Sequence, residues 1–302
     1  MNNKHRSGFW AILASAMILG SYGLLARYLN GAFGYFTQVF FRGTVALAVV
    51  ALTLFVTRST FNLSKKDVVK SAILGLIFFG GVVLFTIGSI LDKISVVLFV
   101  FYAGSFFTSF LISTYYYREK VSAQKGISLA IVFMGLLITT GFNFSTLGLG
   151  LLAAFFSGAL DSSANNFRKQ LAALPKQQVL LVQFAVVTTA ALLCLVLTKE
   201  VPVKDITVPA IFVGIVWGVL WIASNRLIMI GYRYFDFLLA QIVLSSEIFF
   251  ATLFALILFH EMPTLYELIG GILIFVGVLI VDVDITKYWK MKPINREGGT
   301  QI

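Results

Sequence analysis

The chain has 302 residues, of which 59% are hydrophobic and only 12% charged, and its formal net charge is +10. A soluble domain carries about 25% charged residues, so the composition excludes soluble, disordered, coiled-coil and disulfide-rich classes of protein. It also argues against a nucleic-acid-binding protein, despite the positive charge, and indicates a polytopic membrane protein.

A helix that spans a membrane needs about 20 predominantly apolar residues, and windows of that length occur ten times along the chain. In chain order the predicted helices cover residues 8–28, 33–57, 68–91, 95–117, 124–141, 147–172, 178–198, 208–231, 236–260 and 265–285. Barrel strands would be shorter and would alternate apolar with polar residues. The expected fold class is therefore all-α, with ten transmembrane helices. No proline lies in the middle of a predicted helix, so any kink must come from glycine or from packing.

The distribution of Lys and Arg predicts the orientation. Most of the 23 basic residues fall at the two termini and in the loops on the same side of the membrane. The opposite side holds Arg27, Lys93, Lys199 and Lys204. Basic loops stay in the cytoplasm, so both termini are expected there, in a multi-pass protein of the inner (plasma) membrane.

The chain also repeats internally. Residues 118–138 align without a gap with residues 260–280, so that Glu119 matches Glu261 and Gly135 matches Gly277. Each half then holds five helices, and an odd number requires the second half to enter the membrane from the opposite side. We therefore expect a first repeat at residues 1–142, a second, inverted repeat at 143–287, and a cytoplasmic tail at 288–302.

Each half closes on a Glu, a short turn and a glycine-containing last helix, and this pattern resembles the EamA-type drug/metabolite transporter superfamily. The residues that carry the resemblance are Glu119 through Gly135 and Ile138, then Ser246 to Phe250, Glu261, Gly270, Gly271 and Gly277. The first half departs from the pattern, with Ser128 and Leu129 in place of the paired glycines. The resemblance implies a carrier of metabolites or drugs, usually an exporter in bacteria. Close helix packing explains the glycines better than a functional role does.

Three ionisable residues, Arg42, Asp161 and Glu247, stand out deep inside the predicted helices, where a charge is costly and is a functional candidate by default. Arg42 shares a helix face with Gln38 and could bind a carboxylate or phosphate through its guanidinium. Glu247 could bind an amine or carry a proton, because burial disfavours the charged form of a carboxylate. The alternative for both residues is a structural ion pair, either with each other or, for Arg42, with Asp161.

Aligning the two halves places Tyr102 and Ser105 on the helix equivalent to that of Glu247. We therefore expect helices 95–117 and 236–260 to face one cavity. Gln241 falls on a different face of its helix and is a weaker candidate.

The remaining candidates are polar or aromatic. Asp161 and Asn165 form one polar face, whereas residues 166–169 are assigned to the interfacial region. Trp217, Trp221 and Asn225 align on one helix and could stack on a flat or cationic substrate, although core packing explains them equally well. Tyr22 is a weaker candidate of the same kind.

These features favour a secondary-active transporter that exports a small organic metabolite, such as an amino acid, a related compound or a drug-like molecule, by alternating access. Its expected partners are that substrate, the lipid bilayer and, as a candidate coupling ion, the proton, in a monomer or a homodimer. No metal site, cofactor or nucleic-acid partner is predicted. A channel or uniporter is the alternative. A membrane-embedded enzyme is disfavoured, because only two carboxylates and no histidine lie deep inside the predicted helices, away from the helix ends.

Overall fold

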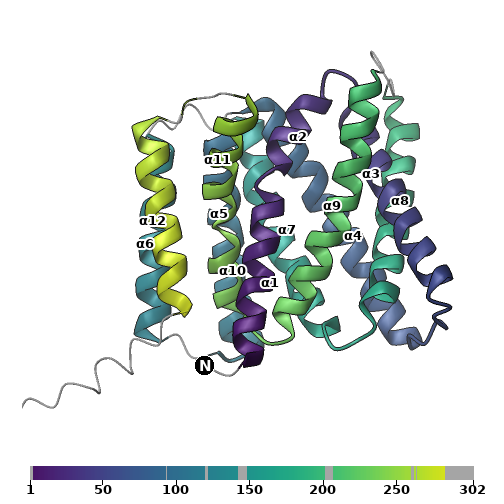
Figure 1. Ribbon diagram of the computed structural model, residues 1–302, viewed down its shortest axis with the longest axis horizontal. Helices are drawn as coiled ribbons and strands as arrows, with labels where there is room; N and C mark the ends of the chain where they lie inside the picture. The colour runs from purple at the N-terminus through teal and green to yellow at the C-terminus, as the bar shows by residue number, and fades with distance from the viewer. Residues whose placement is uncertain are drawn as a thin grey trace, which may run out of the picture.

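The computed structural model describes residues 3–92, 94–119, 122–141, 148–200, 207–259, 262 and 264–282, and the fold over these residues is helical (Figure 1). Its elements are α1 (Asn3–Leu19), α2 (Tyr22–Leu29), α3 (Tyr35–Val56), α4 (Lys65–Leu91), α5 (Ile94–Leu111), the π-helical turn η1 (Ile112–Tyr116), α6 (Ala123–Thr139), α7 (Leu149–Leu171), α8 (Lys176–Thr198), α9 (Val208–Tyr232), α10 (Phe237–Leu244), α11 (Glu247–Phe259) and α12 (Leu265–Asp282). The predicted boundary at 142/143, Glu261 and the tail at 288–302 lie outside the described residues.

Two of the predicted helices are not continuous, which corrects the sequence analysis. The segment predicted at 8–28 divides into α1 and α2 around Gly20 and Ser21, and the segment at 236–260 divides into α10 and α11 around Ser245 and Ser246. Serine hydroxyls donate hydrogen bonds to backbone carbonyls at both interruptions. Ser21 Oγ donates to the Ile18 carbonyl, and Ser245 Oγ donates to the Ile242 carbonyl in α10. Such bonds are one way in which membrane proteins satisfy the backbone at an interruption.

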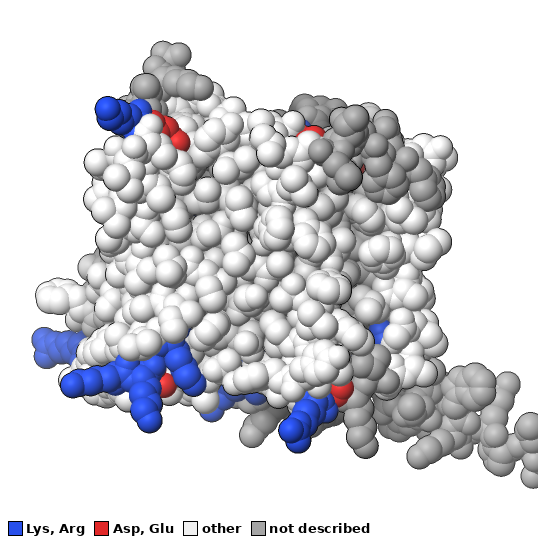
Figure 2. Space-filling view, turned by 180° about the vertical axis from the view of Figure 1, so that it is seen from behind, with Lys and Arg blue, Asp and Glu red and all other residues white. Residues whose placement is uncertain are grey.

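The helices have the apolar character of a multi-pass membrane protein. Over the described residues, seven helical segments are long and apolar enough to cross a membrane, and α6 and part of α12 form shorter apolar helices. The second half of α7 carries a run of polar residues that begins at Asp161. Lys and Arg side chains gather along one edge of the face seen in Figure 2, and a broad uncharged band lies above them. This is the edge at which α1 begins (Figure 1).

Packing joins helices that are distant in the chain. α4 and α5 pack on α7, α3 and α4 pack on α8, and α1 and α3 pack on α9. Buried residues form two apolar clusters: one contains Phe9, Tyr102 and Phe237, and the other contains Phe78, Phe184 and Trp221.

The pair α6 and α12 packs through the glycines that the sequence singled out. An added Cβ at Gly135 would lie 2.8 Å from the Gly270 carbonyl oxygen, and one at Gly277 would lie 2.8 Å from a Val132 methyl. The two helices therefore touch where glycine removes the side chain, as the sequence predicted.

Candidate functional site

A cavity lies between the two apolar clusters, surrounded by α1 to α5, α7 and α9 to α11. Its polar lining is Tyr22, Arg42, Tyr102, Ser157, Asp161, Arg168, Asn225, Gln241 and Glu247. Apolar side chains complete the wall, among them Leu19, Phe78, Phe85, Phe101, Trp221 and Leu244. The site is therefore an apolar chamber with a few charged groups, the usual composition of a small-molecule site.

Arg42 enters the cavity from α3 and is 3% exposed. Its guanidinium carbon lies 4.0 Å from the ring centre of Trp217 and 4.6 Å from that of Trp221, so the cation rests on two indoles. Nη2 donates to Thr86 Oγ1 over a long 3.4 Å, and Nε has no hydrogen-bond partner. Over the part of the chain that the structure describes, no carboxylate lies within 4.0 Å of this guanidinium. Arg42 is therefore a buried cation that forms neither of the ion pairs considered from the sequence.

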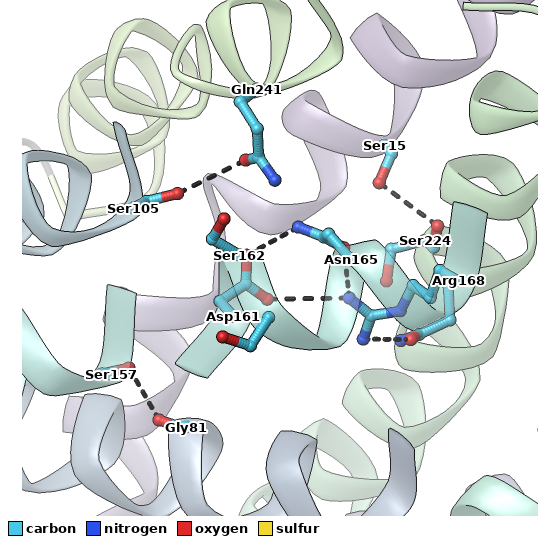
Figure 3. Close-up of polar contacts among 12 residues, drawn as sticks. Ser15, Gly81, Ser105, Ser157, Asp161, Ser162, Asn165, Arg168, Ser224 and Gln241 are labelled. Atoms are coloured by element: carbon cyan, nitrogen blue, oxygen red, sulfur yellow. Dashed lines mark hydrogen bonds and ion pairs between the residues drawn. The ribbon is translucent and has the colours of Figure 1, made fainter. Parts of the chain in front are cut away.

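Unlike Arg42, Arg168 on α7 has protein groups that compensate its charge. Figure 3 shows Arg168 beside Asp161 and Asn165. Its Nη1 lies 3.6 Å from Asp161 Oδ1 and donates to Asn165 Oδ1, and its Nη2 donates to Asn225 Oδ1 at 2.8 Å. Its guanidinium carbon also lies 4.4 Å from the ring centre of Phe78. Asp161 accepts a second bond from Asn165 Nδ2 at 2.9 Å, so these groups form one network.

The assignment of Arg168 to the interfacial region is wrong, because the side chain is 1% exposed and lines the cavity. The polar residues around it resemble a helix end at the water interface, but in the fold they solvate this arginine. The one sequence signal was a second alignment of the two halves, at a shift of 141 residues, which matches Arg27 with Arg168. Arg27 differs from Arg168 in its contacts, because it donates to the backbone carbonyls of Ser89 and Asp92.

Glu247 is the first residue of α11 and is 6% exposed. Its Oε2 lies 2.7 Å from the hydroxyl oxygen of Tyr102 on α5. Within the described residues, no Lys or Arg nitrogen lies within 4.0 Å of its carboxyl group. The structure thus brings the helices of Tyr102 and Glu247 together, and it leaves the carboxyl group facing a phenol instead of a cation.

Gln241 also reaches the cavity, which corrects its placement on a different face. Its side-chain oxygen accepts from Ser105 Oγ at 3.4 Å (Figure 3). Its side-chain nitrogen donates to Tyr232 Oη at 2.9 Å. A face counted in steps of three and four residues assumes one continuous helix. The interruption at Ser245 and Ser246 changes the register between α10 and α11, so Gln241 and Glu247 both point inward.

The two helix interruptions lie against each other beside the cavity. A Cβ added at Gly20 would lie 2.9 Å from the Glu247 carbonyl oxygen and 2.8 Å from the Phe250 Cβ. Leu19 and Tyr22 flank the first interruption, Leu244 and Glu247 flank the second, and all four line the cavity. Interrupted helices that meet at the centre are where many transporters place their substrate sites.

Seven of the eleven residues singled out from the sequence line this cavity: Tyr22, Arg42, Tyr102, Asp161, Trp221, Asn225 and Glu247. The other four do not. Ser105, Asn165 and Trp217 contact residues that do, namely Gln241, Arg168 and Arg42. Gln38 is buried and donates to the Phe33 carbonyl over 3.3 Å, so the structure gives it a contact within its own segment. Over the described residues, no group of three or more His, Cys, Asp or Glu could hold a metal ion.

Comparison with known proteins agrees with the resemblance read from the sequence. Residues 145–282 match the model of the EamA-like transporter family, part of the drug/metabolite transporter superfamily, which confirms that recognition. One solved crystal structure is similar over 91% of this chain and 97% of its own, with a TM-score of 0.75 and 20% sequence identity. At that identity the likeness concerns the fold alone. No curated protein matches this chain.

Proposed function

We propose that this chain, whose second half belongs to the EamA-like transporter family, is a secondary-active exporter of small organic metabolites that carry a carboxylate. The family itself transports small molecules and is not enzymatic. The observation that supports a carboxylate on the substrate is Arg42, a cation buried at the cavity that has no carboxylate partner among the described residues. A buried charge is expensive unless it is paired. A substrate carboxylate would supply the missing charge and form two parallel hydrogen bonds with the guanidinium.

The rest of the lining supports an amino acid or a related compound as the substrate. Glu247 is a second ionisable group with no Lys or Arg nitrogen within 4.0 Å over the described residues, and in its ionised form it could accept a bond from a substrate amine. Phe78, Phe85 and Trp221 offer apolar and aromatic surface between these groups. We assign no binding role to Arg168, because Asp161 compensates its charge and Asn165 and Asn225 accept from its two terminal nitrogens.

Alternating access of two inverted halves, residues 1–142 and 143–287, is the transport mechanism that we propose. It requires ten membrane-spanning segments. In this count α1 and α2 together form one segment, and α10 and α11 together form another. The packing supports the symmetry. If each helix is replaced by its equivalent in the other half, the packed pair α4–α7 becomes α1–α9, and the pair α4–α8 becomes α3–α9. The pairs α3–α8 and α6–α12 are unchanged by this exchange, and all of these pairs are in contact.

We further propose that both termini, and the tail at 288–302, face the cytoplasm in a protein of the inner membrane. The basic edge in Figure 2 supports this orientation, because cytoplasmic loops carry an excess of Lys and Arg. The net charge of +10 then reflects membrane insertion and contact with acidic lipid headgroups, not the charge of the substrate. The proposed unit is a monomer or a homodimer.

The first experiment is a thermal-shift screen on the purified full chain with matched sets of compounds: free amino acids, their methyl esters, decarboxylated amines and simple carboxylates. Ligands stabilise a folded protein by mass action, so we expect amino acids to raise the melting temperature and esters and amines to have little effect. Stabilisation by amines and esters alone would overturn the anionic substrate class.

Transport of the compounds that bind is then measured in proteoliposomes. A carrier saturates with substrate concentration and shows counterflow, whereas a channel shows neither. Linear flux without counterflow would replace the carrier mechanism with the channel alternative.

A further inference from the structure

The interruption between α10 and α11 leaves a backbone carbonyl without its helical partner. In a continuous helix the Leu244 carbonyl would accept from the Ile248 N–H, but that N–H donates to the Ser245 carbonyl at 3.2 Å. The Tyr102 hydroxyl oxygen lies 2.8 Å from the Leu244 carbonyl oxygen. Within the described residues this hydroxyl is the donor that the structure provides for it. Buried carbonyls are nearly always hydrogen-bonded. The Leu244 carbonyl at the interruption therefore needs the hydroxyl proton of Tyr102 as its donor.

The same hydroxyl oxygen is also 2.7 Å from Glu247 Oε2. A phenol has one proton to donate and can accept another bond. If Tyr102 donates to an ionised Glu247, the buried Leu244 carbonyl faces an oxygen lone pair at 2.8 Å and has no donor. If Tyr102 donates to Leu244, its contact with Glu247 needs a proton on the carboxyl group. The second arrangement satisfies all three oxygen atoms.

The charged and titratable groups around Glu247 do not replace that proton. Arg168 is held by Asp161 on α7, and Arg42 on α3 rests on two indoles. Tyr22 on α2 forms a hydrogen bond with Ser224 Oγ at 2.9 Å, and Tyr232 on α9 accepts one from Gln241. Asp161 is a further carboxylate in the same cavity and disfavours a second negative charge there.

We propose that Glu247 is the binding site of the coupling proton. In this conformation the carboxyl group holds a proton and donates it to Tyr102 Oη, which donates its own proton to the Leu244 carbonyl. Moving α11 away from α5 would separate Glu247 from its acceptor and release the proton as H⁺, leaving the carboxylate free for a substrate amine. The proton site stands on the geometry alone, whereas its role in coupling rests on the proposed transport function.

Infrared spectroscopy tests the proton site without a substrate. The full chain is reconstituted in phosphatidylethanolamine and phosphatidylglycerol liposomes at neutral pH, and the carboxylic-acid C=O stretch is recorded in H₂O and in D₂O. We expect a protonated carboxyl band that shifts in D₂O, is lost in Glu247→Gln and moves in frequency in Tyr102→Phe. Asp161→Asn should keep the band, and so should Tyr22→Phe, a matched control because Tyr22 bonds to a serine instead of a carboxyl group.

A spectrum in which the Glu247 band is absent at neutral pH and appears only in acid would overturn the proposal. The same holds if Tyr102→Phe, folded by size-exclusion chromatography, leaves the band unshifted. Coupling is measured separately, as counterflow and pH-gradient-driven flux of a compound that binds. Flux that ignores the gradient in the wild type rejects coupling at Glu247 and leaves the carrier function intact. Absence of flux with the band present rejects the transport function and leaves the proton site intact.

Discussion

The two buried arginines differ in how the protein compensates their charge. Arg168 has Asp161, Asn165 and Asn225 around it, whereas Arg42 has two indole faces and one long bond to a hydroxyl. A cation over an aromatic ring gains on the order of 1–2 kcal/mol, which is less than a buried charge loses by leaving water. The protein therefore compensates the charge of Arg168 itself, and Arg42 is the cation that we propose binds the substrate carboxylate.

This contrast predicts opposite effects of the same substitution. Arg168→Met leaves Asp161 without a cation and the Asn165 side-chain oxygen without the donor that Arg168 provides, so we expect a loss of about 3 kcal/mol, the lower end of the range for breaking a buried pair. Arg42→Met keeps the apolar stem between the indoles and removes an uncompensated charge, so stability without ligand should stay equal or rise. SDS or thermal unfolding of both variants checks this. An equal loss in both variants would make Arg42 a structural residue.

The sequence could reveal Arg42, Asp161 and Glu247 because a charge inside an apolar run has few explanations. It could not reveal Arg168, because the polar side chains that solvate it also make its segment resemble a helix end. Nor could it identify Gln241, since the direction of that side chain depends on an interruption about one helical turn further along the chain. Residue types indicate which groups are costly, but three-dimensional packing decides which of them are compensated.

At the scale of elements, the hydrophobic runs predicted apolar helices along the chain, but they did not predict the two interruptions. Gly20 and Ser245 are residues that continuous membrane helices also tolerate. The structure adds that the first interruption packs against the start of α11: the backbone at Gly20 approaches that helix so closely that no side chain fits. A contact between segments so far apart in the chain is not visible in either segment alone.

Substituting Gly20 tests this contact. In Gly20→Ala the new Cβ would lie 2.9 Å from the Ala251 nitrogen and from the Glu247 carbonyl oxygen. Because these are backbone atoms, α1 and α11 must move apart, and overpacking of this kind costs about 1–3 kcal/mol. The matched control is Gly126→Ala on α6, where an added Cβ meets nothing within 4 Å. We expect a lower melting temperature and slower transport only in Gly20→Ala, and equal melting temperatures would refute the close contact.

At the scale of the whole molecule, one carboxylate ties three elements together on the side where α1 begins. Glu119 follows η1 and accepts from Lys169 Nζ at the end of α7 at 2.8 Å, from the Phe237 N–H at the start of α10 at 2.8 Å, and from Ser113 Oγ at 2.8 Å. These elements also carry Arg168 and Gln241 to the cavity wall. Glu119 therefore holds closed the end of the bundle between the cavity and that side.

Removing the charge should loosen this end. We expect Glu119→Gln to increase access to the cavity from the side of the N-terminus several-fold. The measure is the labelling rate of Ser157→Cys by an impermeant maleimide, in a Cys194→Ser background that removes the one native cysteine. The control is Asp236→Asn, which breaks the Lys125–Asp236 pair at the same end. Asp236 is 52% exposed, and such surface pairs contribute little. Equal labelling rates in the two variants would remove Glu119 from this role.

The pH dependence of stability follows from the same carboxylate. Burial by itself would raise the pKa of Glu119, but the bonds from Lys169, Phe237 and Ser113 outweigh it and hold the pKa below its ordinary value. A carboxyl group with a lowered folded-state pKa stabilises the fold above its unfolded pKa, and this stabilisation is lost as the pH falls through the folded value. The wild type should therefore be more stable than Glu119→Gln at neutral pH, and the difference should shrink in acid. A difference in melting temperature that stays constant from neutral to acid pH would mean that the ionised form of Glu119 does not hold this end together.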